Sequence, residues 1–386
     1  MLPLLIAALL VGGTACAAPE PAPSASTAPA DAHPSSDPVG DWVDDRMSQL
    51  TLRQKAAALL MLHAPGLDPA PLQAYVDAGV SGLILMRDNV PGTPPELAAL
   101  TAAVQGDPDA PVLIGIDEEG GEVQRLPWDG AAGAEALRAA PVPAVRDAFA
   151  ARAATLADGG VSVNFGIVAD VTSDPQSFIS GRVLGIDPAS AADRVAAAVM
   201  GERDVVQSTL KHFPGHGAAP GDSHTSIPTA PLTIDEWRAG PALPFAAGIE
   251  AGAELVMTGH LAYPAVDPAP ASLSPEWHRI LRDDLGFDGV IVTDDMLMLQ
   301  RNDQPEFADP GENAVRAVEA GSDLLLYVLP ADPSEVGVSV DGLTGSIAAA
   351  VESGRITEER LDDAVERVLT LRRSIAVEAT DSGTGE

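Results

Sequence analysis

The sequence predicts a single α/β domain folded as a (β/α)8-type TIM barrel, with no second C-terminal domain. Short apolar strands alternate with helical stretches along most of the 386 residues. These strands are continuous apolar runs, which are typical of parallel strands covered on both faces. Several of them end in a reactive or charged residue, and a barrel gathers all strand carboxyl ends at one mouth. A doubly wound sheet would use mainly its switch point, and no Gly-x-Gly-x-x-Gly follows the first strand.

The barrel domain is predicted to cover residues 39–375. Strands are expected at residues 81–86, 112–117, 161–168, 205–210, 255–260, 289–293 and 323–329. Helices are expected at residues 42–63, 93–105, 144–157, 189–201, 233–251, 275–285, 312–321, 340–354 and 357–373. Two helix starts carry capping-box patterns, in which Thr51 is followed by Gln54 and Thr93 by Glu96.

Both ends of the chain are predicted to lie outside the barrel. Residues 1–16 form an apolar stretch that ends in small residues and Cys16, and they resemble a lipoprotein signal peptide whose cysteine is lipidated. Ordinary cleavage near Cys16, which would release the protein, is the alternative. Residues 17–38, rich in Ala, Pro and Ser, are predicted to be a disordered tether, and residues 376–386 a disordered tail. We therefore expect an exported protein, either anchored by lipid on the extracytoplasmic face of the cell membrane or secreted.

The balance of charge restricts the possible partners. Lys plus Arg number 22 and Asp plus Glu number 56, so the formal net charge is −34. Nucleic acid and anionic lipid would be repelled by such a surface. The single cysteine rules out an internal disulfide bond.

A polar loop after one predicted strand holds three of the seven histidines. Residues 211–224 read Lys-His-Phe-Pro-Gly-His-Gly-Ala-Ala-Pro-Gly-Asp-Ser-His. Asp222 and His224 are two residues apart, and in an extended loop such positions face the same way. A carboxylate beside an imidazole orients the ring and makes it a good general acid and base near neutral pH. Alternatively, Asp222 caps a turn and His224 is a polar surface residue.

The other histidines of this loop do not predict a metal site. His212 and His216 are four residues apart, a spacing that suits a metal on a helix. Pro214 and Gly215 lie between them and disfavour a helix, and no Glu or Cys completes a familiar ligand set. We therefore expect no metal and no organic cofactor, and a structural role for His216. A serine hydrolase is also disfavoured, because no Gly-x-Ser-x-Gly elbow is present.

The predicted strand at residues 289–293 runs directly into two acidic residues, Asp294 and Asp295. Burying a carboxylate at a strand end is costly unless it has a partner or a chemical role. We assign the chemical role to Asp294 and a helix-capping role to Asp295. An aspartate nucleophile with a separate acid/base is the logic of retaining glycoside hydrolysis. Here the pair Asp222 and His224 would replace the usual second carboxylate.

A second group of polar residues predicts a pocket for a neutral polyol. Asp117 ends a predicted strand, and Arg125 follows a Gly-Gly turn. Such side chains can bind neighbouring sugar hydroxyls in a bidentate way. Arg182, Lys211 and His212 add further polar groups, most of this set lying at or just beyond a strand end. Each residue alone is more often a partner in a surface salt bridge.

These motifs resemble glycoside hydrolase family 3, and in particular its single-domain bacterial β-N-acetylglucosaminidases (β-N-acetylhexosaminidases). The segments that carry the resemblance are Lys211-His-Phe-Pro-Gly-His-Gly followed by four residues and Asp222-Ser-His224, Asp117-Glu-Glu-Gly-Gly with Arg125, and Leu285-Gly-Phe-Asp-Gly-Val-Ile-Val-Thr-Asp294-Asp. The resemblance extends from about residue 39 to residue 373.

The resemblance implies a retaining mechanism through a covalent glycosyl-aspartate. Asp294 matches the nucleophile, His224 the acid/base and Asp222 its partner. The positions that match sugar-binding residues are Asp117, Arg125, Arg182, Lys211 and His212. The implied reaction is the hydrolysis of terminal β-linked N-acetylglucosamine from peptidoglycan fragments or chitooligosaccharides. Many relatives with a second domain take their acid/base from it, whereas this barrel is expected to carry its own.

The sequence also departs from the family pattern. Glu122 stands where the family usually has Arg, and this could alter what binds beyond the first sugar. The segment around Arg182 lacks the Ser-Phe pair that usually follows the arginine. Two other functions stay open: a phosphorylase, because a histidine acid/base repels phosphate less than a carboxylate does, and a non-catalytic sugar-binding protein of the cell envelope.

Overall fold

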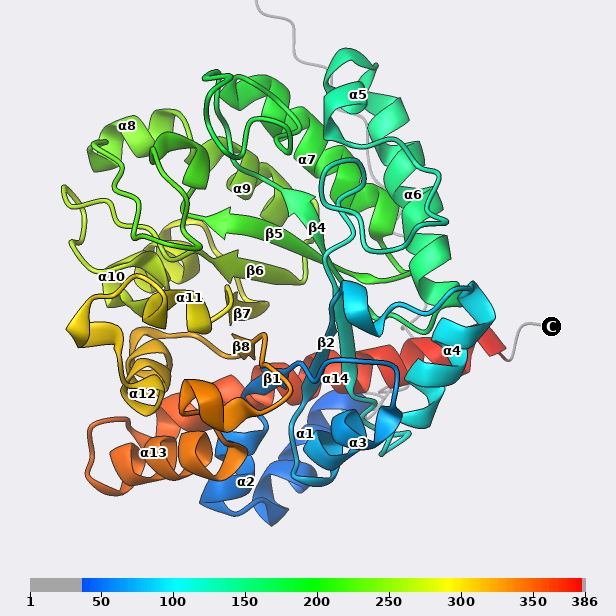
Figure 1. Ribbon diagram of the computed structural model, residues 1–386, viewed down its shortest axis with the longest axis vertical. Coiled ribbons are helices and arrows are strands. Elements are labelled where there is room, and N and C mark those ends of the chain that lie inside the picture. Colours follow the sequence, from blue (N-terminus) through cyan, green and yellow to red (C-terminus); the bar gives the residue numbers. More distant parts are fainter. Residues whose placement is uncertain (1–36, 384–386) are drawn as a thin grey trace, which may run out of the picture. The chain divides into compact units, whose positions relative to one another are not determined.

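The computed structural model describes residues 37–383, which form an eight-stranded parallel sheet surrounded by helices (Figure 1). The strands are β1 Leu60–Leu62, β2 Gly82–Leu85, β3 Leu113–Ile116, β4 Val163–Val168, β5 Gln207–Phe213, β6 Leu255–Thr258, β7 Val290–Thr293 and β8 Leu325–Tyr327. The predicted signal peptide at residues 1–16 with Cys16, and residues 17–36 of the predicted tether, lie outside the described residues.

The sheet curls so that its two end strands meet. Neighbouring strands follow the order β7-β6-β5-β4-β3-β2-β1-β8. Strands β7 and β8 are then linked by a parallel bridge between Val292 and Leu324, and the amide of Thr293 donates to the carbonyl of Leu324 at 3.0 Å. The order of the strands, each paired in parallel with its neighbour along the chain, confirms the predicted TIM-type barrel.

Helices cover the outside of the barrel (Figure 1). Their bounds are α1 Pro38–Gln49, α2 Leu52–Ala57, α3 Pro69–Asp77, α4 Pro94–Ala103, α5 Ala134–Ala139, α6 Val142–Asp158, α7 Pro188–Glu202, α8 Ile234–Ala239, α9 Ala242–Glu250, α10 Pro275–Arg279, α11 Leu297–Gln300, α12 Pro310–Ala320, α13 Val340–Glu352 and α14 Glu358–Gly383. The predicted capping box at the start of α2 is present, because the Thr51 hydroxyl accepts from the Gln54 amide and the Gln54 side chain accepts from the Thr51 amide. None of the described helices is both long and apolar enough to cross a membrane.

The barrel interior is filled by apolar side chains from alternating strand positions. Met61 and Phe165 are fully buried there, and they fit because the facing residues are glycines. A Cβ atom on Gly115 would lie 2.6 Å from the Phe165 ring, and one on Gly82 would lie 2.5 Å from the end of Met61. Helix α14 contributes Val368 to the same cluster. This packed interior leaves the carboxyl ends of the strands as the place for a ligand.

The structure corrects several predicted helices and strands, most of them near the first strand. Residues 42–63 were predicted to form one helix but contain α1, α2 and the strand β1. Strand β1 is only the three residues Leu-Met-Leu, and such a short apolar run cannot be distinguished from a buried helical turn by periodicity. Helix α3 was not predicted, and the predicted helix at 233–251 is two helices that meet at Gly240 and Pro241.

Two further corrections concern element ends. Strand β5 continues beyond Leu210 to Phe213, so Lys211 and His212 belong to the strand and not to the loop. Their polar side chains can be buried because they form ion pairs with buried carboxylates. The hydrophobicity pattern of the sequence does not predict these pairs. The predicted disordered tail is helical as far as Gly383, because α14 continues past residue 373.

Candidate active site

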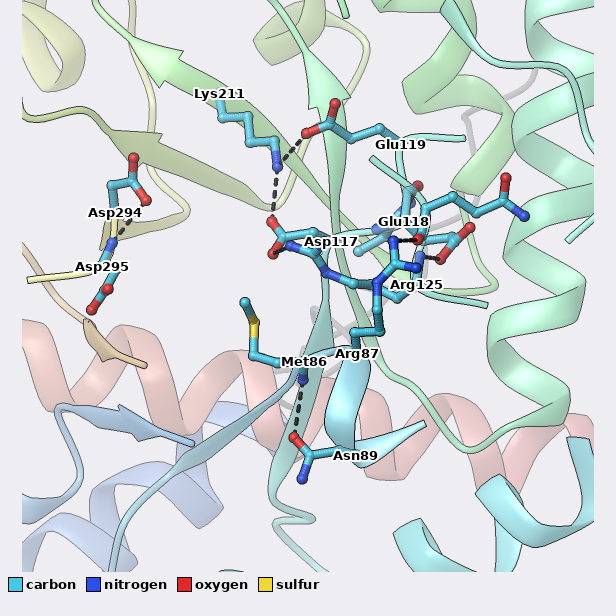
Figure 2. Close-up of polar contacts among 12 residues, drawn as sticks. Met86, Arg87, Asn89, Asp117, Glu118, Glu119, Arg125, Lys211, Asp294 and Asp295 are labelled. Atoms are coloured by element: carbon cyan, nitrogen blue, oxygen red, sulfur yellow. Dashed lines mark hydrogen bonds and ion pairs between the residues drawn. The ribbon is translucent and has the colours of Figure 1, made fainter. Parts of the chain in front are cut away.

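The mouth of the barrel holds a cavity of about 340 Å³. Every residue predicted to be catalytic or sugar-binding lines it, except Asp222, which reaches it through His224. These residues are Asp117, Arg125, Arg182, Lys211, His212, His224 and Asp294. They come from the ends of different strands, which the closed barrel brings together. Figure 2 shows Asp294 and Asp295 on one side of the barrel mouth and Asp117 with Lys211 on the other.

Ion pairs link the residues of the inner wall of the cavity (Figure 2). The Lys211 ammonium lies 2.9 Å from Asp117 Oδ1 and 2.8 Å from Glu119 Oε1. Arg125 Nη2 lies 3.0 Å from Asp117 Oδ2. Arg182 binds Glu119 through two hydrogen bonds, Nε to Oε2 at 2.9 Å and Nη2 to Oε1 at 2.7 Å. We call Asp117, Glu119, Arg125, Arg182 and Lys211 the charged wall.

The charged wall stays ionised over a wide pH range. Burial acts to raise the pKa of Asp117, but the charges of Lys211 and Arg125 outweigh it and hold that pKa well below its ordinary value. Lys211 and Arg182 lower the pKa of Glu119 against the same effect of burial. Burial acts to lower the pKa of Lys211, but Asp117 and Glu119 raise it above its ordinary value. The wall therefore presents fixed, oriented donors and acceptors to a ligand.

Glu119 was missed by the sequence reasoning, although it joins the two halves of the wall. Its side chain is 3% exposed and contacts both Lys211 and Arg182. The signal was the run of three acidic residues that begins at Asp117 directly after a strand. The neighbouring Glu118 has a different task, because its Oε2 accepts the amides of Arg125 at 2.8 Å and of Leu126 at 2.9 Å and so fixes the loop.

His212 is held by a second buried carboxylate that the sequence reasoning missed. Its Nδ1 lies 2.8 Å from Asp170 Oδ2, just beyond β4, and its Nε2 lies 3.5 Å from Arg182 Nη2. An Nδ1–H that donates to Asp170 leaves Nε2 free to accept from an arginine or a hydroxyl. Asp170 also accepts the amide of His216 at 2.5 Å, which gives His216 the structural position predicted for it. The available signal was again an acidic residue at a strand end, Val168-Ala-Asp170.

Asp294 and Asp295 follow β7 and have different surroundings. The amide of Asp294 donates to the Thr258 carbonyl at 3.0 Å, which ties its backbone to β6. Asp294 Oδ1 accepts the amide of Asp295 at 2.8 Å. Asp295 Oδ1 accepts the amides of Leu297 at 3.1 Å and of Val328 at 3.0 Å, so it holds the turn between β7 and α11. The predicted helix cap is not formed, because the N-cap of α11 is Met296. Asp295 Oδ2 lies 3.3 Å from Arg301 Nη1.

Asp294 is kept in the ionised state. Burial acts to raise its pKa, but the imidazoles of His212 and His260, the amide of Asp295 and the Lys211 ammonium lower it below the ordinary value. Within residues 37–383, no Lys, Arg or His forms an ion pair with Asp294, unlike the carboxylates of the charged wall. A partly buried carboxylate that is ionised but not paired has a lone pair available for a ligand.

Asp222 and His224 form a pair on an exposed loop. His224 Nδ1 lies 2.6 Å from Asp222 Oδ1, and the same oxygen accepts the His224 amide at 2.9 Å. The His224 side chain is 58% exposed. The Phe178 ring stands perpendicular to the imidazole of His224, with 6.1 Å between the ring centroids, and its centroid lies 4.8 Å from that of the His216 ring. The pairing leaves Nε2 of His224 free at the cavity.

Among the described residues, no group of His, Cys, Asp and Glu side chains is arranged to hold a metal ion. His212 instead contacts Asp170, and His216 packs against Phe178.

Known proteins are similar to this chain in sequence and in fold. Residues 51–371 match the glycosyl hydrolase family 3 N terminal domain. The chain belongs to glycosyl hydrolase family 3.

Several members of family 3 are similar to it over most of its length. The β-hexosaminidase of Stenotrophomonas maltophilia K279a is 34% identical over 319 residues, which cover 77% of this chain and 93% of that protein. The family 3 β-N-acetylglucosaminidase of Paenibacillus sp. FPU-7 is 35% identical with a TM-score of 0.76, over 84% of this chain and 63% of the other. LpqI of M tuberculosis is 30% identical with a TM-score of 0.75, over 86% and 96% of the two chains.

The structure accounts for the departure from the family pattern at Glu122. This side chain lines a second cavity, of about 370 Å³, together with Arg87, Gln124 and Arg125. Its carboxylate occupies the space beside Gly181 that a Cβ atom there would fill. Glu122 therefore packs next to the turn that precedes Arg182, outside the charged wall of this family 3 site.

Proposed function

We propose that this family 3 chain is a retaining β-N-acetylhexosaminidase, which hydrolyses terminal β-linked N-acetylglucosamine through a covalent glycosyl-aspartate. Two of the similar proteins support the reaction, because their names describe a β-hexosaminidase and a family 3 β-N-acetylglucosaminidase. The observation that carries the mechanism is that Asp294 and His224 line one cavity with the charged wall.

In the first step, Asp294 attacks the anomeric carbon while His224 protonates the leaving oxygen. Asp294 suits this role because it is ionised and unpaired. His224 suits its role because Asp222 engages Nδ1 and leaves Nε2 to carry the proton to the oxygen. In the second step, His224 takes a proton from water, the water oxygen attacks the anomeric carbon, and the carboxylate of Asp294 is released.

The charged wall and His212 are proposed to bind the sugar ring. Asp117, Arg125, Arg182, Lys211 and His212 offer both donors and acceptors, which suits the hydroxyls of a neutral sugar. Their mutual ion pairs hold them in place before the sugar arrives, so little ordering is needed on binding. This arrangement favours a hydrolase over a protein that only binds sugar, because it is combined with an ionised, unpaired carboxylate.

A trapped intermediate tests this mechanism directly. A 5-fluoro N-acetylglucosaminyl inhibitor should leave a glycosyl adduct on Asp294, found by mass spectrometry of the digested protein. The variant D294A should lose at least about 10³-fold in kcat with an aryl N-acetylglucosaminide. The matched control D295N changes the neighbouring carboxylate and should still form the adduct on Asp294. An adduct on another residue, or a D294A variant with most of its rate, would contradict the mechanism.

We also propose that the protein is exported and anchored by lipid to the cell membrane. The apolar stretch at residues 1–16 supports export, and Cys16 supports a lipid anchor on the extracytoplasmic face. The substrates would then be peptidoglycan fragments or chitooligosaccharides. A lipid label incorporated by the wild type but not by C16A, with release of the C16A variant into the medium, is the expected result. Release of unlabelled wild type would indicate a secreted enzyme.

A further inference from the structure

A buried acidic residue close to the charged wall forms no ion pair within residues 37–383. This residue is Glu202, which ends helix α7 and whose side chain is fully buried. Its Oε1 accepts a hydrogen bond from Asn164 Nδ2 at 2.5 Å, whereas its Oε2 has no hydrogen-bond partner in the described part of the chain. The buried cation Arg152 forms its ion pair with Asp129 instead, at 2.9 Å. A carboxylate in such surroundings is costly, so the group takes up a proton.

The surroundings of Glu202 keep it neutral at pH 7. Burial raises the pKa of Glu202 to about 8, although the hydrogen bond from Asn164 and the charge of Arg152 on α6 act in the opposite direction. The carboxylate of Glu254, just before β6, raises this pKa further. Because Oε1 accepts from Asn164, the proton lies on Oε2.

Asn164, in β4, connects this acid to the charged wall. Its Oδ1 accepts the amide of Glu118 at 3.1 Å, and its Nδ2 donates to the Glu118 carbonyl at 3.1 Å. The side-chain amide therefore holds the peptide groups on both sides of Glu118, the residue between Asp117 and Glu119. The direction in which these two carboxylates leave the end of β3 depends on Asn164.

We infer that Glu202 is a positioning residue of the charged wall: as a neutral acid it fixes the side-chain amide of Asn164, and Asn164 fixes the strand end that carries two of the wall's carboxylates. An acceptor at Glu202 Oε1 requires that Asn164 turns Nδ2, and not Oδ1, toward it and toward the Glu118 carbonyl. This role rests on the proposed function, in which the wall binds the sugar.

Ionisation of Glu202 is expected to loosen the same wall. The new charge would be buried without an ion-pair partner. Arg152 is the cation that can respond, because it is fully buried and its Nη1 has no hydrogen-bond partner among the described residues. Arg152 also supports the loop that carries Arg125, through Asp129 at 2.9 Å and the carbonyl of Ala132 at 3.1 Å. A turn of Arg152 toward Glu202 would weaken this support, so sugar binding should weaken as the pH rises through the pKa of Glu202.

The variant E202Q tests this role, because glutamine copies the neutral acid and cannot ionise. At pH 7, E202Q should keep kcat/KM for an aryl N-acetylglucosaminide within about twofold of the wild type. At pH 9, E202Q should exceed the wild type by about tenfold, mainly through KM, since a group with a pKa of about 8 is about nine-tenths ionised there. Other ionisations affect both proteins alike, so the ratio of the two proteins isolates Glu202.

Two further variants separate positioning from packing. E202M keeps the size of the side chain but offers Asn164 no carboxyl oxygen, and it should raise KM by about tenfold at pH 7 with a smaller change in kcat. The matched control is E254Q, which removes another acid whose pKa burial raises. Glu254 Oε2 accepts the amide and hydroxyl of Ser208 and not Asn164, so E254Q should still lose kcat/KM between pH 7 and 9.

The outcomes distinguish this role from the proposed function. A ratio of E202Q to wild type that is constant between pH 7 and 9 overturns the role of Glu202 alone. E202Q without activity at pH 7, E202M with the KM of the wild type, or a pH effect confined to kcat overturns it as well. A wild type that neither cleaves nor binds an aryl N-acetylglucosaminide overturns the proposed function, and the role of Glu202 with it.

Discussion

Glu119 provides the sharpest test of how the charged wall works. The substitution E119Q keeps the shape of the side chain but removes its charge. Lys211, 2% exposed, would then keep only Asp117 as an anionic partner, and Arg182, 10% exposed, would lose the carboxylate that it binds through two hydrogen bonds. Removing one partner of a buried ion pair typically costs about 3–5 kcal/mol, because a buried charge is left without compensation.

We expect E119Q to lower the free energy of unfolding by about 3 kcal/mol, the lower end of that range, because Gln still accepts a hydrogen bond. Urea denaturation at pH 7 measures this value. The matched control is E122Q, an exposed glutamate three residues along the same loop, which should change stability by less than about 0.5 kcal/mol. The variant E119Q should also lose about 10²-fold in kcat/KM, because the cations that we propose to bind the sugar are no longer held in place.

The pH dependence gives a second readout for the same variant. The pKa of Glu119 is lower in the folded chain than its ordinary value of 4.5. A carboxylate whose pKa is lower in the folded chain than in the unfolded chain stabilises the fold. This stabilisation is complete above the pKa of the unfolded chain and is lost as the pH falls through the pKa of the folded chain. The difference in stability between wild type and E119Q should therefore be complete at pH 7 and shrink below about pH 4.5. If E119Q unfolds like the wild type at pH 7, the wall does not need its central charge.

Three further predictions follow from other parts of the site and the fold. D222N should lower kcat most for substrates with poor leaving groups, since these need protonation by His224. A series of aryl N-acetylglucosaminides with different leaving groups measures this dependence, and an equal loss of kcat for every substrate would contradict the prediction. F178A should show the same leaving-group pattern to a smaller degree, and azide should restore part of its rate if the ring positions the imidazole. Burial lowers the pKa of His278 to about 4; stability should therefore fall as pH drops from 6.5 toward 4, and H278Q should flatten this slope in urea titrations.

The sequence was sufficient for the fold class because continuous apolar strands and their polar ends are local signals. It located Asp117 and Asp294 correctly at strand ends, where the barrel brings them to one cavity. It failed at Lys211 and His212, which were placed in a loop but lie within β5. Polar residues normally argue against a buried strand, and only the tertiary pairing with distant carboxylates reverses that argument.

The side chains that contact the predicted site residues could not be predicted from the sequence. Asp170 contacts His212 from 42 positions away in the chain, and Glu119 contacts Arg182 from 63 positions away. Such contacts depend on how β3, β4 and β5 lie side by side, which no short motif describes.

The charge balance of the site connects its structure to the proposed second step. The charged wall holds three cations, Arg125, Arg182 and Lys211, and two carboxylates, Asp117 and Glu119. Asp294 and Asp170 add negative charge beside the wall. In the proposed glycosyl-aspartate, Asp294 is an ester without charge, so the cavity carries one more positive charge than it does with the free carboxylate. This excess favours the departure of Asp294 as a carboxylate, and it stabilises the negative charge that returns to its oxygen as water attacks. The negative charge returns when the bond between Asp294 and the anomeric carbon breaks, so the charged wall is expected to contribute to the proposed deglycosylation as well as to binding.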